Sequence, residues 1–299
     1  MAVVLKNKKT INRLLTISIV VVALACLGFL LYNPAIEFIN ALYMEQTVSI
    51  YDEKTQSLTE EKINTYIEDA EKYNNNLKDK VSIQDRYSEE SSENQYSEIL
   101  NISGNGVIGV VTVPSVNIDL PIYHDGSEEV LSNGVVHMIN TSFPIGGKST
   151  HAIISGHTAF PGKIFFDRLV DVKVGDSVYI TVLDHIYAYK VCDIYVVLPE
   201  DIEKYNIEPG KDLVTLLTCT PYSINTHRLL VRAERDTESE KIVNAKEENG
   251  KKNKIEIHPT SKLDILSTAF FALSLLVFIS GLMLYIISKK KGDRNESKV

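Results

Sequence analysis

Cysteine is scarce in this chain, and its few thiols show no pairing or metal-binding pattern. Three cysteines occur among 299 residues, namely Cys26, Cys192 and Cys219. Cys26 lies inside a long apolar run and the other two stand alone, so no disulfide framework is predicted. Neither C-x-x-C nor H-x-x-x-H spacing occurs, which excludes the common zinc-site patterns. We therefore expect no metal and no cofactor.

The chain also lacks an excess of basic over acidic residues. Residues 33–262 hold 22 of the 31 Lys and Arg and 36 of the 39 Asp and Glu, so their formal charge is near −14. Nucleic-acid-binding proteins present a basic face to the phosphates. The acidic balance therefore argues against a nucleic-acid partner. No internal repeat is visible either.

Two long apolar runs carry no charged residue, over residues 14–32 and 265–287. Each is about 20 residues long, enough for a helix to cross a bilayer, and we predict transmembrane helices at 14–32 and 263–288. Basic residues precede the first and follow the second, which places the tails 1–13 and 289–299 in the cytoplasm. The chain is thus predicted to be a two-pass protein of the cell membrane whose middle region is extracellular. The alternatives, a cleaved signal peptide and a buried core helix, fit the run lengths and basic flanks less well.

The N-terminal part of the external region, residues 33–100, has helical spacing of its apolar residues. Apolar side chains recur at steps of three and four residues over 35–56 and 59–79, which predicts two helices. Residues 84–98 read QDRYSEESSENQYSE. This stretch is acidic and almost free of aliphatic side chains, and is predicted to form a loop or mobile segment.

Residues 101–236 have a different character, with short β-branched runs between turn signals. The runs cover residues 106–113, 118–123, 151–155, 177–183, 187–198, 213–218 and 228–233. Seven or eight strands at this spacing predict a mainly-β domain, either a closed barrel or a sandwich. One helical turn is expected over 161–169, with its Phe and Leu side chains inward. Residues 237–262 are charged without apolar periodicity and are predicted to link this domain to the second membrane helix.

Three polar residues each stand at the end of a predicted strand. His157 follows the run 151–155, Cys219 ends the run 213–218, and Arg228 opens the last run. Strand ends from distant parts of a chain can meet at one rim of a barrel. There, the His and the Arg would stabilise a thiolate, and the His would also protonate a leaving amine. The Arg would hold an oxyanion with a fixed fork of donors.

A Cys–His pair alone is weak support for catalysis, because each residue has a structural alternative. A lone His after Gly is often structural, an Arg at a strand start often faces solvent, and a free Cys is often a small buried apolar side chain. Papain-like proteases place Cys before His within a CGSCW-like segment, and caspases carry Q-A-C-x-G. Neither pattern occurs here, so the residues alone leave the reaction open.

Three segments around these residues resemble those of one enzyme family. Residues 215–219 read TLLTC, which resembles the TLxTC signature of sortases. Residues 155–157 and 225–232 resemble the segments that carry the catalytic histidine and arginine of that family. The resemblance implies an eight-stranded sortase-type β-barrel whose Cys, His and Arg cleave an LPxTG-like sorting signal between Thr and Gly through a thioester. Thr218 and Thr220, on either side of the thiol, are expected to contribute oxyanion or substrate contacts.

Within the sortases, the chain is most similar to class C, the group that polymerises pilins. A second C-terminal membrane helix is typical of that class, and the CTPY and NTHR segments resemble it closely. The resemblance implies that the acyl group passes from Cys219 to a lysine amine of a pilin subunit, during pilus assembly at a Gram-positive surface. The expected partners are proteins with LPxTG-type sorting signals, pilins among them, and the lipid bilayer.

Class C sortases also carry an N-terminal lid with an Asp-Pro-aromatic motif. The matching place here reads Asp85-Arg86-Tyr87, so the Asp and the aromatic are kept while Arg replaces the Pro. The resemblance implies a lid over about residues 81–98, in which Asp85 pairs with Arg228 and Tyr87 covers the thiol. Without the fixed φ of proline, this lid is expected to be more mobile. The alternative is that these residues form a plain linker.

Three other functions fit the same residues. A housekeeping-type sortase would attach surface proteins to an amine of the cell wall, and the lid and second membrane helix argue against it. A surface cysteine hydrolase would use water as acceptor, so product analysis with and without an amine separates it. An adhesion or scaffold module would use no thiol chemistry, and its thiol would not react with a sorting-signal analogue.

Removing either lid side chain should expose the thiol. We expect Asp85→Ala and Tyr87→Ala each to speed the alkylation of Cys219 several-fold, because the lid competes with any reagent for the site. Peptide mapping by mass spectrometry after timed alkylation follows Cys219 separately from Cys192. Unchanged rates in both variants would leave residues 81–98 as a linker.

Overall fold

The computed structural model of the chain describes residues 38–78, 96–124 and 128–248, together with a few positions between residues 17 and 36. The expected lid residues Asp85 and Tyr87 and the second predicted membrane helix lie outside the described residues. Among the described positions, no helix combines the length and the apolar character needed to cross a bilayer. The two membrane helices therefore stay predictions.

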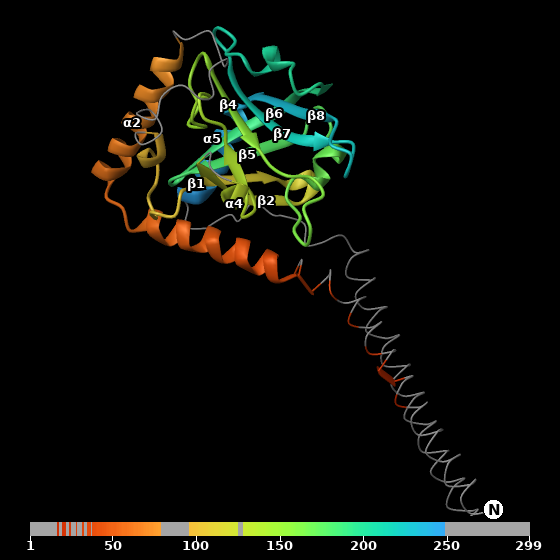
Figure 1. The fold of residues 1–299 in the computed structure, drawn as a ribbon. Helices are drawn as coiled ribbons and strands as arrows, with labels where there is room; N and C mark the ends of the chain where they lie inside the picture. The colour runs from red at the N-terminus through yellow and green to blue at the C-terminus, as the bar shows by residue number, and fades with distance from the viewer. Residues whose placement is uncertain are drawn as a thin grey trace, which may run out of the picture. The chain divides into compact units, whose positions relative to one another are not determined.

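Eight strands form one closed barrel (Figure 1). Their bounds are Val107–Val113 (β1), Ile118–His124 (β2), Val135–His137 (β3), Thr150–Ser155 (β4), Ser177–Val182 (β5), His185–Val197 (β6), Asp212–Thr220 (β7) and His227–Arg235 (β8). Around the barrel the order is β1-β2-β3-β4-β7-β8-β6-β5. Two neighbouring pairs, β2–β3 and β4–β7, are parallel, and the others are antiparallel. The predicted mainly-β barrel is confirmed, and closure leaves no sheet edge.

The burial of each strand follows from what covers its two faces. Along β5, buried and half-buried positions alternate, because side chains point in turn to the core and away from it. Every position of β1 is buried. Val111 belongs to the cluster that fills the barrel, whereas Val110 belongs to a second cluster with Val48 and Tyr51 of an N-terminal helix. β1 is therefore covered on both faces.

Two N-terminal helices pack on the outside of the barrel, at residues 38–56 and at Glu60–Lys78 (α2) (orange in Figure 1). The hydroxyl of Tyr51 donates to the carbonyl of Ile108 at 3.0 Å and accepts from the backbone N–H of Leu183 at 2.8 Å. One buried side chain thus joins the first helix to β1 and to the residue after β5. The two helices predicted from apolar spacing are confirmed.

The second helix and the segment that begins at Tyr96 meet on the barrel at Phe143. Asn74 of α2 exchanges two hydrogen bonds with the backbone of Phe143, at 3.0 and 2.7 Å. The ring of Tyr96 stacks on Phe143 with centroids 5.4 Å apart, and its hydroxyl lies 2.9 Å from Nδ1 of His137. Nε2 of His137 donates to the carbonyl of Ser142 at 2.8 Å. Both segments are therefore held at one buried point.

Strand β3 and the segment 161–169 differ from the predictions, because tertiary contacts rather than local sequence determine their structure. β3 was not among the predicted runs, because three residues are too short to show alternation. The helical turn expected at 161–169 is loop up to Phe166, followed by a short 3-10 helix at Asp167–Asp171. The expected inward side chains Phe165, Phe166 and Leu169 are nevertheless buried.

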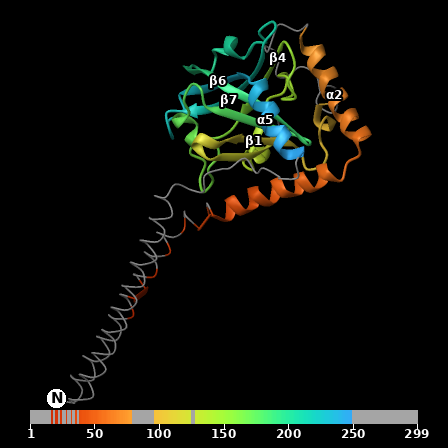
Figure 2. The ribbon, with the colours of Figure 1, turned by 180° about the vertical axis from the view of Figure 1, so that it is seen from behind.

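The linker expected over residues 237–262 begins instead with a helix, α5 at Thr237–Glu248, which lies on the outside of the barrel (Figure 2). The carboxylate of Asp236 accepts the backbone N–H three residues on, at 3.1 Å, as a helix N-cap does. The carboxylate of Glu240 pairs with Arg235 of β8. Because α5 docks largely through polar contacts, its sequence lacks the apolar periodicity that predicts a packed helix.

Buried histidines should make folding weaken as the pH falls below about 6.5. Burial lowers the pKa of His137 from 6.5 to about 3 and that of His151 from 6.5 to about 4. Between those values and 6.5, the unfolded chain binds more protons than the folded chain. The contribution is therefore fully present above the unfolded pKa and declines below it, by about 1.4 kcal/mol per pH unit for each histidine.

Urea unfolding of the chain at intervals between about pH 7.5 and pH 5 measures this slope. We expect His151→Gln to flatten the slope by about 1.4 kcal/mol per pH unit, because it removes one of the two buried imidazoles. A free energy of unfolding that is constant or rises toward pH 5 would contradict the assignment of buried neutral imidazoles.

Candidate active site

Two of the three predicted catalytic residues face each other across the β7–β8 pair. Cys219 and Arg228 are directly opposite in the antiparallel register, which sets their Cα atoms about 4.5–5.5 Å apart. Opposite residues send their side chains to the same face of a sheet. Both residues are partly exposed, and Cys219 is a free thiol. The thiol and the guanidinium therefore start from adjacent points on an accessible face.

His157 reaches the same place from β4. Ser155 is opposite Leu217 in the parallel β4–β7 register, and the ladder continues as the backbone N–H of Gly156 donates to the carbonyl of Leu217 at 3.0 Å. His157 follows one residue later, just beyond the end of β4 and on the side of β7 where Cys219 lies. We term His157, Cys219 and Arg228 the catalytic row; it comprises one residue each of β7 and β8 and the residue that follows the end of β4 by two.

Thr218 alternates to the face opposite Cys219 and fixes the segment that carries His157. Its hydroxyl donates to the carbonyl of Gly156 at 2.7 Å and lies 2.5 Å from the hydroxyl of Thr158. These contacts hold the residues on both sides of His157 against β7. This role differs from the substrate contact expected for the Thr218 hydroxyl.

The connection after His157 is folded around Asp167. The Asp167 carboxylate accepts hydrogen bonds from the backbone N–H groups of Ala159 at 2.9 Å and Phe165 at 3.0 Å. The imidazole of His157 lies against the ring of Phe160, with centroids 5.1 Å apart. Backbone hydrogen bonds and an aromatic contact thus limit where the imidazole can point.

The guanidinium of Arg228 is held by the backbone that precedes it. Its Nη1 donates to the carbonyls of Asn225 at 3.3 Å and His227 at 3.2 Å. A guanidinium has five N–H donors in a rigid plane, so donors remain beyond these two contacts. The group is therefore positioned to present N–H donors to an oxyanion or a substrate carbonyl beside the thiol.

The sheet next to the catalytic row is apolar on the same face. Leu217 is opposite Leu230 of β8, and Leu230 is opposite Tyr195 of β6. These side chains lie outside the barrel interior in a separate cluster, which also includes Met138, Ile153, Val197 and Tyr205. Leu217, Leu230, Tyr195 and Val197 are termed the apolar floor. Because Cys219 follows Leu217 by two residues, its thiol stands at one end of this floor.

One step further from the row, Arg232 anchors the connection between β6 and β7. Its guanidinium pairs with Glu208 at 2.6 Å and donates to the carbonyl of Lys204. Its Cζ also lies 5.4 Å from the ring centroid of Tyr195. The hydrogen bond from Lys211 lowers the pKa of Glu208, so the carboxylate stays charged at neutral pH. The connection is therefore tied down beside the apolar floor.

The strand register sets Cys219 opposite Arg228 and directs the segment that carries His157 to the same end of β7, while the residues that support them were not predicted from the sequence. The catalytic role of the row and the substrate contact of Thr220 stay predictions. The place of Arg232 near the row could have been predicted, because it lies four residues after Arg228 and hence on the same face of β8. The role of Asp167 could not, because it depends on the path of the connection around its carboxylate.

The arrangement suits nucleophilic acyl transfer. A thiolate at Cys219 could attack a carbonyl, Arg228 could stabilise the oxyanion, and His157 could exchange the proton with the amine. These three side chains between them supply a nucleophile, a proton carrier and an oxyanion donor. Among the residues that the structure describes, no group of three His, Cys, Asp or Glu could hold a metal ion.

Comparisons with known proteins point the same way. A family model described as the Sortase domain matches residues 111–236. The crystal structure of sortase C1 from Streptococcus agalactiae is 38% identical and covers 64% of this chain and 98% of its own, with a TM-score of 0.61. Sortase C from Clostridium perfringens, solved with the C-terminal cell wall sorting motif, is 39% identical and covers 64% of this chain and 98% of its own, with a TM-score of 0.55.

A curated relative matches over a shorter region. Sortase A of Streptococcus agalactiae is 34% identical over 137 residues, which are 45% of this chain and 55% of the relative. This chain therefore spans about half the length of that curated relative.

Replacing the guanidinium by an ammonium should disable the catalytic row although the charge is kept. We expect Arg228→Lys to lower the rate of LPxTG-peptide cleavage on the order of 100-fold, because one lysine point charge cannot reproduce the fork of donors. Cleavage is followed by chromatography of the peptide products. Arg228→Gln serves as the comparison that lacks both charge and fork. If the Lys variant kept near-normal rates while the Gln variant lost them, charge alone would suffice and the proposed geometry would be wrong.

Proposed function

The chain belongs to the sortase family, and we propose that it is a cysteine transpeptidase. It cleaves an LPxTG-like sorting signal between Thr and Gly and transfers the acyl group to a lysine amine of a pilin subunit. One observation carries this proposal. Cys219 lies opposite Arg228 across β7–β8, and the segment that carries His157 leaves β4 along β7 beside them, held by the hydrogen bond from Gly156 to Leu217.

The first half of the reaction forms a thioester. The thiolate of Cys219 attacks the carbonyl carbon of the signal's threonine, and the developing oxyanion is stabilised by the guanidinium of Arg228. The new S–C bond forms as the C–N bond to glycine breaks. The imidazolium of His157 gives its proton to the leaving glycine nitrogen. The sorting signal is thus cut, and its N-terminal part stays on the enzyme.

The second half returns the enzyme to its starting state. The neutral ε-amine of an acceptor lysine attacks the thioester carbonyl, and an isopeptide N–C bond forms as the C–S bond breaks. The imidazole of His157 takes the proton that the amine releases, which restores the imidazolium and the thiolate. Atoms and protons balance over the two halves with the three side chains and the two substrates alone.

The apolar floor supports a substrate of the LPxTG type. A leucine and a proline precede the two residues before the cleaved bond, and they need an apolar surface that begins near the thiol. Leu217 and Leu230 are themselves buried, but Tyr195 and Val197 are partly exposed, and Val197 is opposite Arg228 in the β6–β8 register. These two side chains can therefore take the leucine and the proline, and Arg232 and Glu208 hold the β6–β7 connection beside them.

Similarity to class C sortases supports the pilin lysine as acceptor. The matches to the sortase C1 and sortase C structures extend over 98% of those two chains. The sortase C from Clostridium perfringens was solved with a cell wall sorting motif. The housekeeping-type alternative, an amine of the cell wall, uses the same first half of the reaction. The hydrolase alternative differs only in the acceptor, which would be water.

We also propose that the enzyme is a two-pass membrane protein with its catalytic domain outside the cell. The support comes from the two uncharged runs near the ends of the chain and from their basic flanks. On this reading, both termini are cytoplasmic and the barrel works at the outer surface of the membrane.

The thioester should be visible by mass. We expect the full chain in detergent, mixed with an LPxTG peptide, to gain the mass of the peptide up to its threonine at Cys219. A lysine-containing acceptor peptide should then discharge the adduct as an isopeptide-linked product. Cys219→Ala should give neither species, because no other described thiol joins the row.

Cys192→Ala is the matched control. Burial raises the pKa of the Cys192 thiol, so this free cysteine is a poor nucleophile, and its loss should leave both species at wild-type levels. Product formation by Cys219→Ala would remove that thiol from the mechanism. Discharge that is as fast without the acceptor as with it would make the enzyme a hydrolase.

A further inference from the structure

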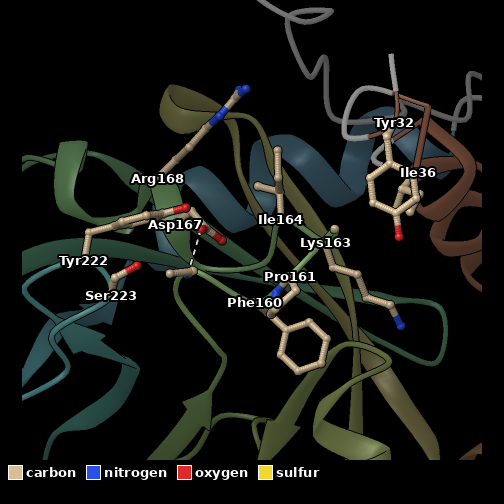
Figure 3. Close-up of a pocket in the computed structure, with 12 residues that line it drawn as sticks. Tyr32, Ile36, Phe160, Pro161, Lys163, Ile164, Asp167, Arg168, Tyr222 and Ser223 are labelled. Carbon is tan, nitrogen blue, oxygen red and sulfur yellow. Dashed lines mark hydrogen bonds between the residues drawn. The ribbon is translucent and has the colours of Figure 1, made fainter. Parts of the chain in front are cut away.

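A pocket of about 520 Å³ opens beside the catalytic row, and none of its lining residues belongs to the apolar floor. Tyr222 and Ser223 of the β7–β8 turn form one side, residues 159–164, 167 and 168 of the connection after His157 form its base, and Tyr32 and Ile36, which precede the N-terminal helix at 38–56, form the other side (Figure 3). The mechanism above assigns nothing to this pocket. Its walls come from the turn between the two strands that carry Cys219 and Arg228, from the connection that begins at His157, and from the segment that leads to the first predicted membrane helix.

Large apolar side chains are exposed around the pocket. Tyr222 is 64% exposed, Ile224 in the same turn is 66% exposed, and Ile164 on the connection is 42% exposed. The N-terminal helix adds further exposed apolar side chains, namely Phe38, Ile39, Leu42 and Tyr43. Single exposed apolar residues are ordinary, but a group of them on adjacent segments marks an interaction surface.

The pocket lies close to where the chain is proposed to leave the bilayer. Tyr32 is the last residue of the predicted span, and both Tyr32 and Ile36, which comes four residues later, line the pocket. The side chain of Asn40 donates to the carbonyl of Gly162, so the connection is fastened to the helix just beyond. Each polar layer of a bilayer is about 5–8 Å thick. If Tyr32 ends the membrane span, as proposed above, the connection and the turn that line the same pocket lie at headgroup depth.

The composition of the pocket suits that depth. Tyr32 and Tyr222 stand on its two sides, and tyrosine is enriched where a bilayer meets water. Lys163 and Arg168 line the pocket with a single acidic residue, Asp167, whose carboxylate is already bound by two backbone N–H groups. The external region as a whole is strongly acidic. A locally cationic pocket on such a protein favours anionic headgroups.

We propose that this face is a bilayer-docking surface. The side chains of Tyr222, Ile224 and Ile164 insert into the outer leaflet, and the pocket takes an anionic lipid headgroup at the guanidinium of Arg168, while the Lys163 ammonium, which donates to the carbonyl of Ser132, adds positive charge from the other side of Ile164 (Figure 3). The inference rests on the proposed membrane anchoring. It adds that the β7–β8 turn itself touches lipid, so the catalytic row works at the bilayer surface and favours acyl donors presented there.

The absence of tryptophan from the chain makes a direct test available. A single tryptophan introduced as Tyr222→Trp or Ile224→Trp reports alone on its surroundings. The full chain is placed in nanodiscs of phosphatidylcholine and phosphatidylglycerol, with or without bromine on the acyl chains. We expect the bromines to quench the fluorescence of both variants by roughly half, because docked side chains lie about 5–10 Å into the boundary between headgroups and acyl chains.

The matched control is Lys148→Trp. Lys148 is exposed and precedes β4, whereas His157 follows that strand, so the control tryptophan lies at the opposite end of the barrel and should not be quenched. Equal, weak quenching at positions 148, 222 and 224 would overturn the docking surface. We expect Tyr222→Trp to be quenched more strongly in discs that contain phosphatidylglycerol than in discs of phosphatidylcholine alone. Adding Arg168→Gln to Tyr222→Trp should remove this difference. Equal quenching of Tyr222→Trp in the two kinds of disc would overturn the headgroup site.

Peptide transpeptidation by the unmodified chain in the same nanodiscs separates this inference from the proposed function. Turnover without quenching of the two reporter variants would overturn the docking surface alone. Quenching without turnover would support the surface and overturn the proposed function.

Discussion

Strand register is the constraint on which the site depends. Cys219 and Arg228 share a row only because β7 and β8 pair in one register, and His157 joins them only because β4 runs parallel to β7 in another. Side chains alternate faces along a strand, so a slip of one residue in β7 would turn the thiol inward and present Thr218 or Thr220 in its place. The packed barrel interior, which includes Val214, Leu216 and Val231, excludes that slip because it would expose this apolar set to solvent.

The outer face of the same strands is where substrate chemistry becomes feasible. It is covered by segments that are themselves fastened to the barrel through buried polar contacts. Asp167 folds the connection behind the imidazole, and Arg232 holds the β6–β7 connection beside the apolar floor. The N-terminal helices are joined to the barrel by the same means, through Tyr51 and Asn74. The barrel thus presents two reactive residues at the ends of β7 and β8 and the third on a connection that backbone hydrogen bonds hold in place.

The sequence was most informative where a local pattern reports a physical requirement. Short β-branched runs between turn signals predicted seven of the eight strands, and the positions of three polar residues at strand ends indicated the row. What it could not predict depends on distant partners. The three residues of β3 are defined by their neighbours, and α5 is held by Glu240 against Arg235 rather than by an apolar stripe. The role of Asp167 likewise depends on backbone that folds around it.

The central claim is that the row and the apolar floor form one substrate site. The most direct measurement is a crystal structure of the chain with an LPxTG-type peptide linked to Cys219 by a disulfide that mimics the thioester. We predict that the guanidinium of Arg228 donates to the threonine carbonyl, that the imidazole of His157 faces the same bond, and that the leucine lies on Tyr195 and Val197, the partly exposed residues of the floor. A peptide that leaves the thiol away from this floor, with the guanidinium in solvent, would contradict the account.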